Sequence, residues 1–328
     1  MPMDQPADRN LALELVRVTE AAAIAAAKWQ GRGDKNRVDQ AAVDAMRHML
    51  ATVDVDGTVI IGEGEKDEAP MLFNGEVVGN GQGPKMDIAV DPVDGTRLTA
   101  LGMPGSLAVI AMADRGSMYA PGSLVYMDKI AVGEEAAGMV DIDAPVEHNL
   151  RQVAKAKGMD VDEVTAVILD RPRNEECIRQ VRAAGGRIAL IGDGDISGAI
   201  STAKSDSGID ILLGIGGSPE AVTSACALGA LHGDQQCRLW PRDESERHYA
   251  LDHGLDLEHV LTIGDLVDSD NTFFAATGVT SGSLLSGVRF YGNRVETHSV
   301  VMRSTSGTIR FVESIHRLDW LDDVHAIG

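Results

Sequence analysis

Residues 86–96, MDIAVDPVDGT, place two carboxylates and a hydroxyl directly after a short apolar run. A second segment, VIIGEGEKDE at residues 59–68, brings four acidic residues to the end of another such run. Short β-branched runs that end in turn-forming residues are typical of buried strands. Carboxylates crowded where strands end repel one another unless cations lie between them, and Mg²⁺ and Mn²⁺ favour such oxygen ligands. The two segments therefore predict a metal-dependent site that handles phosphate.

The charge of the chain limits its partners. With 29 Lys and Arg against 50 Asp and Glu, the 328 residues carry a formal net charge of −21. We expect so acidic a protein to bind neither nucleic acid nor an anionic membrane surface. An anionic substrate would need local positive charge from metal ions and from a few well-placed Arg or Lys side chains.

Cysteine usage and the start of the chain indicate the compartment. The three cysteines, Cys177, Cys226 and Cys237, show no C-x-x-C spacing, which argues against a disulfide framework or a zinc site and fits a reducing cytosol. Residues 1–5 lack the basic and apolar regions of a signal peptide, and the apolar stretch 21–27 is too short to span a bilayer. We expect a soluble, cytoplasmic protein.

Two helices are predicted at the start of the chain. Residues 10–30 show helical periodicity, and a second helix is expected to begin near Asn36. Asp39 would lie in its first turn, where a carboxylate suits the helix dipole, so spacing alone favours a helix-start role for it. Further on, the pattern predicts strands at 107–113 and 124–132 and a helix at 146–157.

Strands alternate with helices in the second half, which is the pattern of an α/β sheet with crossover helices. Turns join short strands at the C-terminal end, and these strands can return to pack on the sheets. The expected strands are 164–169, 187–191, 209–213, 288–291, 297–303 and 308–313, and the expected helices are 175–184, 196–203 and 219–231.

Each strand of the alternating region ends in a distinctive loop: DRPR at 170–173, GDGD at 192–195 and GIGGSPE at 214–220. Ligands of open α/β sheets bind outside the carboxyl ends of the strands. Arg171 and Arg173 could clamp a phosphate, and the glycines before the third helix could offer backbone N–H groups to an anion. Neither G-x-G has the third glycine of a dinucleotide fingerprint.

Simpler roles exist for several of these residues taken singly. Asp193 and Asp195 are ordinary turn residues, and Glu220 is a common kind of acid for the first turn of a helix. Glu65, Asp67 and Glu68 could merely solvate a loop. The nine histidines fall in no metal-ligand spacing. Each residue has a simpler explanation by itself, but all these motifs together would be improbable in a chain that lacked a metal and phosphate site.

Together the motifs resemble the magnesium-dependent, lithium-sensitive phosphatase superfamily of inositol monophosphatases and fructose-1,6-bisphosphatases. GRGDKN at 31–36, GEGEKDEAPML at 62–72 and GIGGSPE narrow the resemblance to class II bacterial fructose-1,6-bisphosphatase, from about Asn10 to Val312. It implies an α/β fold, the layered α/β/α/β/α sandwich of these sugar phosphatases. We expect an N-terminal α+β metal-binding phosphatase domain at 1–160, a C-terminal α/β substrate-binding domain at 161–328, and a homodimer or homotetramer.

The resemblance also implies roles for single residues. Asp39 and Glu63 match ligands of one metal ion, which replaces the helix-start reading of Asp39. Some members carry glutamate at position 94 and lysine at position 171, and both changes keep the charge. Ligands of a second metal ion are matched by Asp91, Asp94 and Glu220; catalytic residues by Lys35, Glu63, Asp91 and Thr96; and substrate contacts by Asp94, Gly95, Thr96, Tyr126, Arg171, Pro172, Arg173, Asp193, Gly194, Asp195 and Gly217.

The implied reaction is metal-dependent hydrolysis of the 1-phosphate of D-fructose 1,6-bisphosphate to fructose 6-phosphate and phosphate, in gluconeogenesis, with Mn²⁺ or Mg²⁺. Arg171 and Arg173 would hold the distal 6-phosphate. A dual fructose-1,6- and sedoheptulose-1,7-bisphosphatase is the nearest alternative, because both sugars present the same phosphate ends. An inositol monophosphatase would leave both arginines idle, and a catalytically silent sugar-phosphate binder would be expected to have a broken ligand set.

Overall fold

The computed structural model describes residues 11–64 and 71–318, so Glu65, Asp67 and Glu68 lie outside the described residues. The contacts within the chain define two compact units. The first comprises the chain up to Gly116 together with the chain from Asn271 onward, and the second comprises Ser117–Asp270. Over residues 11–64 and 71–318, each unit contains one β-sheet, and the two sheets share no strand.

The first unit is built on an eight-stranded sheet with the order β12-β13-β11-β4-β3-β1-β2, and β14 pairs with β13. β1 and β3 run parallel, whereas the other pairs of this sheet are antiparallel. The strands are β1 (Asp56–Ile61), β2 (Val77–Val78), β3 (Lys85–Asp94), β4 (Leu107–Asp114), β11 (Phe273–Gly278), β12 (Arg289–Tyr291), β13 (Arg294–Arg303) and β14 (Thr308–Arg317).

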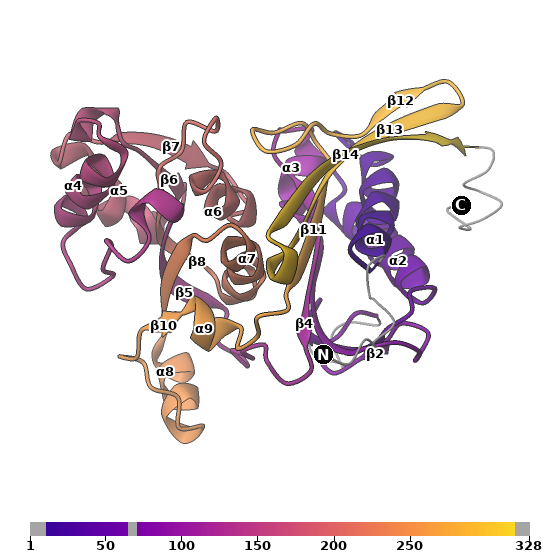
Figure 1. Ribbon diagram of the computed structural model, residues 1–328, viewed down its shortest axis with the longest axis horizontal. Coiled ribbons are helices and arrows are strands. Elements are labelled where there is room, and N and C mark those ends of the chain that lie inside the picture. Colours follow the sequence, from indigo (N-terminus) through magenta and orange to yellow (C-terminus); the bar gives the residue numbers. More distant parts are fainter. Residues whose placement is uncertain (1–10, 65–70, 319–328) are drawn as a thin grey trace. The chain divides into compact units, whose positions relative to one another are not determined.

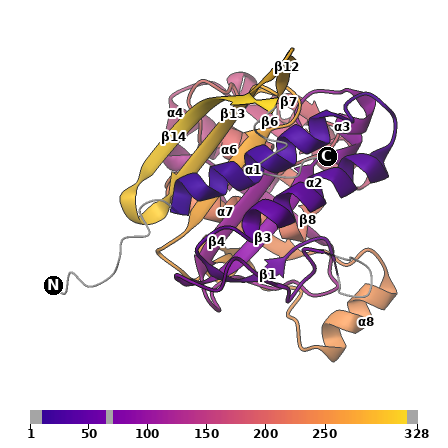
Figure 2. The ribbon, with the colours of Figure 1, turned by 90° about the vertical axis from the view of Figure 1, so that its right-hand side faces the viewer.

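Two helices, α1 (Leu11–Ala27) and α2 (Lys35–Leu50), lie side by side against one face of this sheet (Figures 1 and 2). Their apolar side chains form one core with alternate residues of the central strands, such as Ile88, Ile110 and Phe273. A short helix, α3 (Thr96–Leu101), follows β3 directly. Burial of this shared apolar surface is what holds the helices to the sheet.

The second unit contains a six-stranded sheet with the order β10-β9-β5-β8-β6-β7, in which β6 runs parallel to β7 and β8. Helices α4 and α5 pack against one face of it, and α6 and α7 pack against the other (Figure 1). The strands are β5 (Tyr126–Val132), β6 (Thr165–Leu169), β7 (Arg187–Ile191), β8 (Ile211–Gly217), β9 (Asp234–Leu239) and β10 (Leu261–Thr262); the helices are α4 (Val146–Lys157), α5 (Glu175–Ala183), α6 (Ile196–Thr202), α7 (Ser218–Ala230), α8 (Glu244–Asp252) and α9 (Ile263–Leu266).

This architecture confirms the α/β class and most of the expected elements. The expected boundary near residue 160 falls inside the second unit, because β5 pairs with β8 and β9. The expected first-turn position of Asp39 is wrong. Helix α2 begins at Lys35, and the N-cap carboxylate of Asp34 accepts the N–H of Arg37, so Asp39 lies in the second turn.

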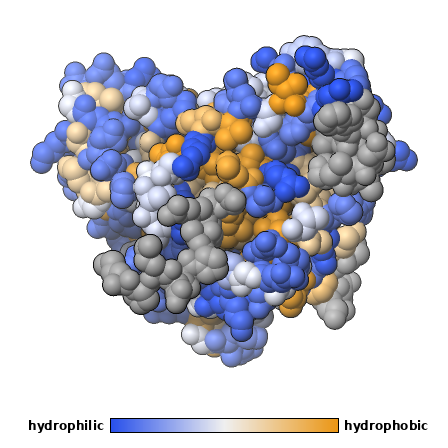
Figure 3. All heavy atoms as spheres, turned by 45° about the vertical axis from the view of Figure 1, so that its right-hand side comes forward, coloured by the Kyte–Doolittle hydropathy of each residue, from blue (hydrophilic) through white to orange (hydrophobic). Residues whose placement is uncertain are grey.

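Two surface properties bear on partners. No helix of the described residues is long and apolar enough to cross a membrane. Hydrophilic side chains spread over much of the face that Figure 3 shows, in keeping with a chain in which 24% of the residues are charged.

The core of the first unit gives a stability prediction. Ile110 of β4 is 0% exposed among α1, α2 and the central strands, whereas Val77 of β2 is 65% exposed. Ile110→Ala removes buried methyl groups and leaves a cavity, so we expect it to lower the free energy of unfolding by about 2–5 kcal/mol. Val77→Ala is the matched control, with an expected change within about 0.5 kcal/mol. Urea denaturation of both variants measures the difference, and equal losses would contradict this description of the core.

Candidate functional site

The acidic residues of the first unit gather where β1 and β3 end. These strands are parallel, and Ile61 pairs with Ala89. Glu63 and Asp91, each two residues beyond that pair, therefore lie at the same edge of the sheet, because parallel strands end together. The two acidic motifs, which are separate in the sequence, thus meet in the fold.

Glu63 lies close enough to Asp39 for the two carboxylates to repel. Burial, and then the charge of Asp39, raise the pKa of Glu63 to about 7, and burial also raises the pKa of Asp39. A cation between the two carboxylates would favour their charged forms and so lower both pKa values. Lys35 lies four residues before Asp39 on α2, and residues at this spacing share one face of a helix.

Asp91 and Asp94 are brought together by an irregularity in β3. Residues three apart on a regular strand point to opposite faces of a sheet. The register of β3 with β4 shifts between Asp91 and Asp94, and the two residues offer carboxylate oxygens within 4.8 Å of each other. Bulges of this kind re-aim side chains next to functional sites. Asp94 is only 3% exposed, so its charge is strongly desolvated.

Glycines allow the backbone to approach closely at both motifs. Gly95, the residue before α3, has φ +88°, a conformation that L side chains rarely adopt. A Cβ at Gly62 would lie 2.0 Å from the carbonyl oxygen of Leu72. Directly after Gly95, the hydroxyl of Thr96 donates to the carbonyl of Val93 at 3.1 Å, which fixes its oxygen beside the two aspartates.

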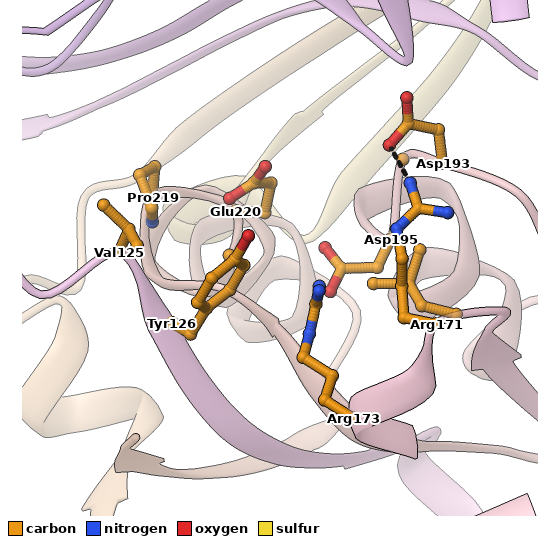
Figure 4. Close-up of a pocket in the computed structure, with 11 residues that line it drawn as sticks. Val125, Tyr126, Arg171, Arg173, Asp193, Asp195, Pro219 and Glu220 are labelled. Atoms are coloured by element: carbon orange, nitrogen blue, oxygen red, sulfur yellow. Dashed lines mark hydrogen bonds and ion pairs between the residues drawn. The ribbon is translucent and has the colours of Figure 1, made fainter. Parts of the chain in front are cut away.

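In the second unit, loops after the strands surround a cavity of about 320 Å³ (Figure 4). The cavity is lined by nearly all the residues that the sequence predicts to contact substrate from this part of the chain. Pro172 is the exception: it opens the 3₁₀ turn η3 (Pro172–Asn174) and is not in the lining. The lining residues are Val125, Tyr126, Leu169, Arg171, Arg173, Asp193, Gly194, Asp195, Gly217, Pro219 and Glu220.

Local contacts hold the two arginines of the cavity. The guanidinium of Arg171 donates to Asp193 at 3.0 Å, as the dashed line in Figure 4 marks. Arg173 donates to the carbonyl of Ile215 at 3.0 Å, and its guanidinium carbon lies 4.2 Å from the ring centroid of Tyr126. Guanidinium groups held in this way suit the recognition of phosphate. Arg242, which the sequence analysis missed, lies 5.9 Å from the same ring.

A second missed residue is the buried Lys129 of β5, whose ammonium group lies 2.8 Å from Asp195. Burial alone would lower the pKa of Lys129, but the charges of Asp195 and Glu220 raise it above its ordinary value. Burial, and next the charge of Asp195, raise the pKa of Glu220, while Lys129 opposes them. The Oε2 atom of Glu220 is buried and makes no hydrogen bond to a described residue, which fits a ligand-binding role.

The predicted site residues therefore form two groups. Lys35, Asp39, Glu63, Asp91, Asp94, Gly95 and Thr96 belong to the first unit, and the rest belong to the second. The sharing of one metal ion by Asp91, Asp94 and Glu220 stays a prediction. Cysteine chemistry has no support, because burial raises the pKa of all three thiols to about 12.

Comparison with known proteins identifies the family. Residues 9–316 match the model of the family described as bacterial fructose-1,6-bisphosphatase, glpX-encoded. The chain is 47% identical over 328 residues to fructose-1,6-bisphosphatase 1 class 2 of Escherichia coli K12, an alignment that covers 96% of this chain and 97% of that protein. The same values hold for the class 2 enzymes of E. coli O6:H1 and Shigella flexneri. The chain therefore belongs to the family of bacterial class II fructose-1,6-bisphosphatases.

The repulsion at Glu63 gives a prediction on pH for the metal-free protein. Below pH 4.5, its ordinary pKa, Glu63 is protonated in both states, whereas above its folded pKa of about 7 the folded state carries a buried, repelled charge. Stability in EDTA should therefore fall as pH rises through this window, by up to about 3 kcal/mol from this residue. Glu63→Gln stays neutral and should lose this part of the dependence. Urea unfolding in EDTA from pH 4.5 to 8 measures it, and identical pH profiles would contradict the assignment.

Proposed function

We propose that this chain hydrolyses the 1-phosphate of D-fructose 1,6-bisphosphate to fructose 6-phosphate and phosphate, as a gluconeogenic enzyme. The observation that carries the proposal is family membership over almost the whole chain. The cavity of the second unit supports it, because its guanidinium groups can receive a phosphate and its carboxylates can accept hydrogen bonds from sugar hydroxyls.

We propose Mg²⁺ or Mn²⁺ as the cofactor. The donor set fits, because hard carboxylate oxygens that are desolvated and close to one another lie at the edge where β1 and β3 end. The residues that would hold the metal ions are Asp39, Glu63, Asp91, Asp94 and Glu220. Bound divalent ions supply charge neutralisation for the phosphate and lower the pKa of a coordinated water from about 15.7 towards about 7.

The side chains themselves position the substrate. The Thr96 oxygen, whose proton is donated to Val93, is left to accept a hydrogen bond from the attacking water, and the backbone after Gly95 contacts the scissile phosphate. Lys35 adds a positive charge one helical turn from Asp39. Arg171 and Arg173 hold the distal 6-phosphate, which is how a chain of net charge −21 binds a polyanion.

Sedoheptulose 1,7-bisphosphate is the second candidate substrate, because it presents the same two phosphate ends as fructose 1,6-bisphosphate. Inositol monophosphate is disfavoured, since Arg171 and Arg173 would then face no second phosphate. A silent sugar-phosphate binder is disfavoured by the complete set of carboxylates. We further propose membership of the lithium-sensitive phosphatase superfamily, a cytoplasmic location, and a homodimer or homotetramer.

Phosphate release tests the reaction and the metal requirement together. We expect release from fructose 1,6-bisphosphate with Mn²⁺ or Mg²⁺ and none in EDTA, with sedoheptulose 1,7-bisphosphate and inositol 1-phosphate run alongside to rank the substrates. Asp91→Asn removes one charge at the acidic edge and should lower kcat by at least about a hundredfold, because electrostatic stabilisation of this kind is a large part of catalysis. Full turnover by Asp91→Asn would refute the scheme.

Arg173→Ala tests the distal phosphate. Loss of a charged hydrogen bond should raise KM for fructose 1,6-bisphosphate by about 10- to 100-fold. It should leave kinetics with fructose 1-phosphate nearly unchanged, since that sugar has no 6-phosphate. The control is Arg179→Ala, because Arg179 of α5 is an exposed arginine that pairs with Glu176 in the same unit. An equal loss with both substrates would assign Arg173 to another part of the sugar phosphate.

A further inference from the structure

Lys129 is a buried cation in direct contact with the cavity wall. Its side chain is 2% exposed, and its Nζ donates to Oδ2 of Asp195 at 2.8 Å. Asp195 lines the cavity, and its carboxylate reaches into the space that also holds Arg171 and Arg173 (Figure 4). Lysine is almost never fully buried unless it is paired, so this ion pair is the reason the side chain can lie there.

The buried position of Lys129 cannot be explained by a contribution of its charge to helix stability. Asp195 directly precedes α6, and Glu220 lies in the first turn of α7, so both carboxylates lie at helix N-termini. The helix dipole favours anions there and disfavours a cation. The charge of Glu220 nevertheless acts on Lys129, together with that of Asp195. The lysine is therefore stabilised by the charges of the two carboxylates and not by the helix dipoles.

The ion pair is held in one place by the backbone of β8. A Cβ at Gly216 would lie 1.8 Å from Oδ2 of Asp195 and 3.0 Å from Nζ of Lys129. The pair thus packs directly against a residue without a side chain. Because β5 and β8 are paired along their length, neither Lys129 nor Gly216 can move away without breaking the ladder.

We infer that Lys129 is a positioning residue for the sugar-phosphate site: it holds one carboxylate oxygen of Asp195 so that the other is presented to a sugar hydroxyl. This inference rests on the proposed function. It predicts that Lys129 governs how tightly the sugar phosphate binds and has little influence on the chemistry at the other phosphate.

The test compares Lys129→Met with the wild-type enzyme. We expect KM for fructose 1,6-bisphosphate to rise about tenfold or more, the loss that follows from one misplaced charged hydrogen bond. We expect kcat to fall by a smaller factor than KM rises, because the lysine contacts Asp195 directly and acts on Glu220 only through its charge. Calorimetric titration with fructose 6-phosphate in EDTA should show the same weakening without metal or turnover. In the background of Asp195→Asn, removing Lys129 should change neither KM nor this affinity further.

A matched control separates positioning from general stability. Lys157 of α4 makes an equivalent 2.8 Å ion pair with Asp210 in the same unit, and neither residue lines the cavity. Lys157→Met should lower the melting temperature but leave KM and fructose 6-phosphate affinity unchanged. If Lys129→Met does not fold, Gly216→Ala displaces the pair with both charges retained and should weaken fructose 6-phosphate binding.

Three results would overturn the inference. The first is a fructose 6-phosphate affinity of folded Lys129→Met within twofold of the wild type, and the second is an equal effect of Lys129→Met in the wild-type and Asp195→Asn backgrounds. The third is an unchanged fructose 6-phosphate affinity of Gly216→Ala. The proposed function has its own readout, because it fails if the wild-type enzyme with metal releases no phosphate from fructose 1,6-bisphosphate. The titration in EDTA still decides the role of Lys129 in that case.

Discussion

Repulsion between desolvated carboxylates is the constraint on which this structure depends. At the edge where β1 and β3 end, the half-buried Glu63 lies close enough to Asp39 to be repelled, and a register shift places Asp91 and Asp94 with oxygens within 4.8 Å of each other. The repulsion between Glu63 and Asp39 costs free energy in the absence of cations, and the pKa of about 7 at Glu63 expresses that cost. A fold that maintains such a cost keeps its carboxylates ready for a divalent cation.

The second unit has the opposite requirement, because its cavity has to bind an anionic ligand in a protein of net charge −21. Its cavity is lined by the half-buried Arg171 and Arg173, and Lys129 is buried against Asp195. Arg171 pairs with Asp193 and Arg173 donates to a backbone carbonyl, whereas the buried lysine pairs with Asp195. Positive charge in the second unit is thus divided between the lining of the cavity and a buried ion pair.

The sequence pattern predicted elements whose residues repeat with a clear period, such as α4 and β7, whose bounds match the structure. It missed β11, because FFAATG is short and buried on both sides, so neither alternation nor length distinguishes it. The motifs located the carboxylates and the arginines. They did not locate Lys129, since its partner lies 66 residues away and only the pairing of strands brings the two together.

The missed strand also explains why the first unit cannot be a continuous piece of chain. β11 lies between β4 and β13, pairs with β4 along its whole length and with β13 over Phe273–Thr277, and its six residues are all buried. Without the chain from Asn271 onward, β4 would be left with an unpaired apolar edge, which is unstable in water and prone to aggregation. Asp91 and Asp94 lie on β3, the other neighbour of β4. The geometry of the acidic edge in the first unit therefore depends on a segment that follows the entire second unit in the sequence.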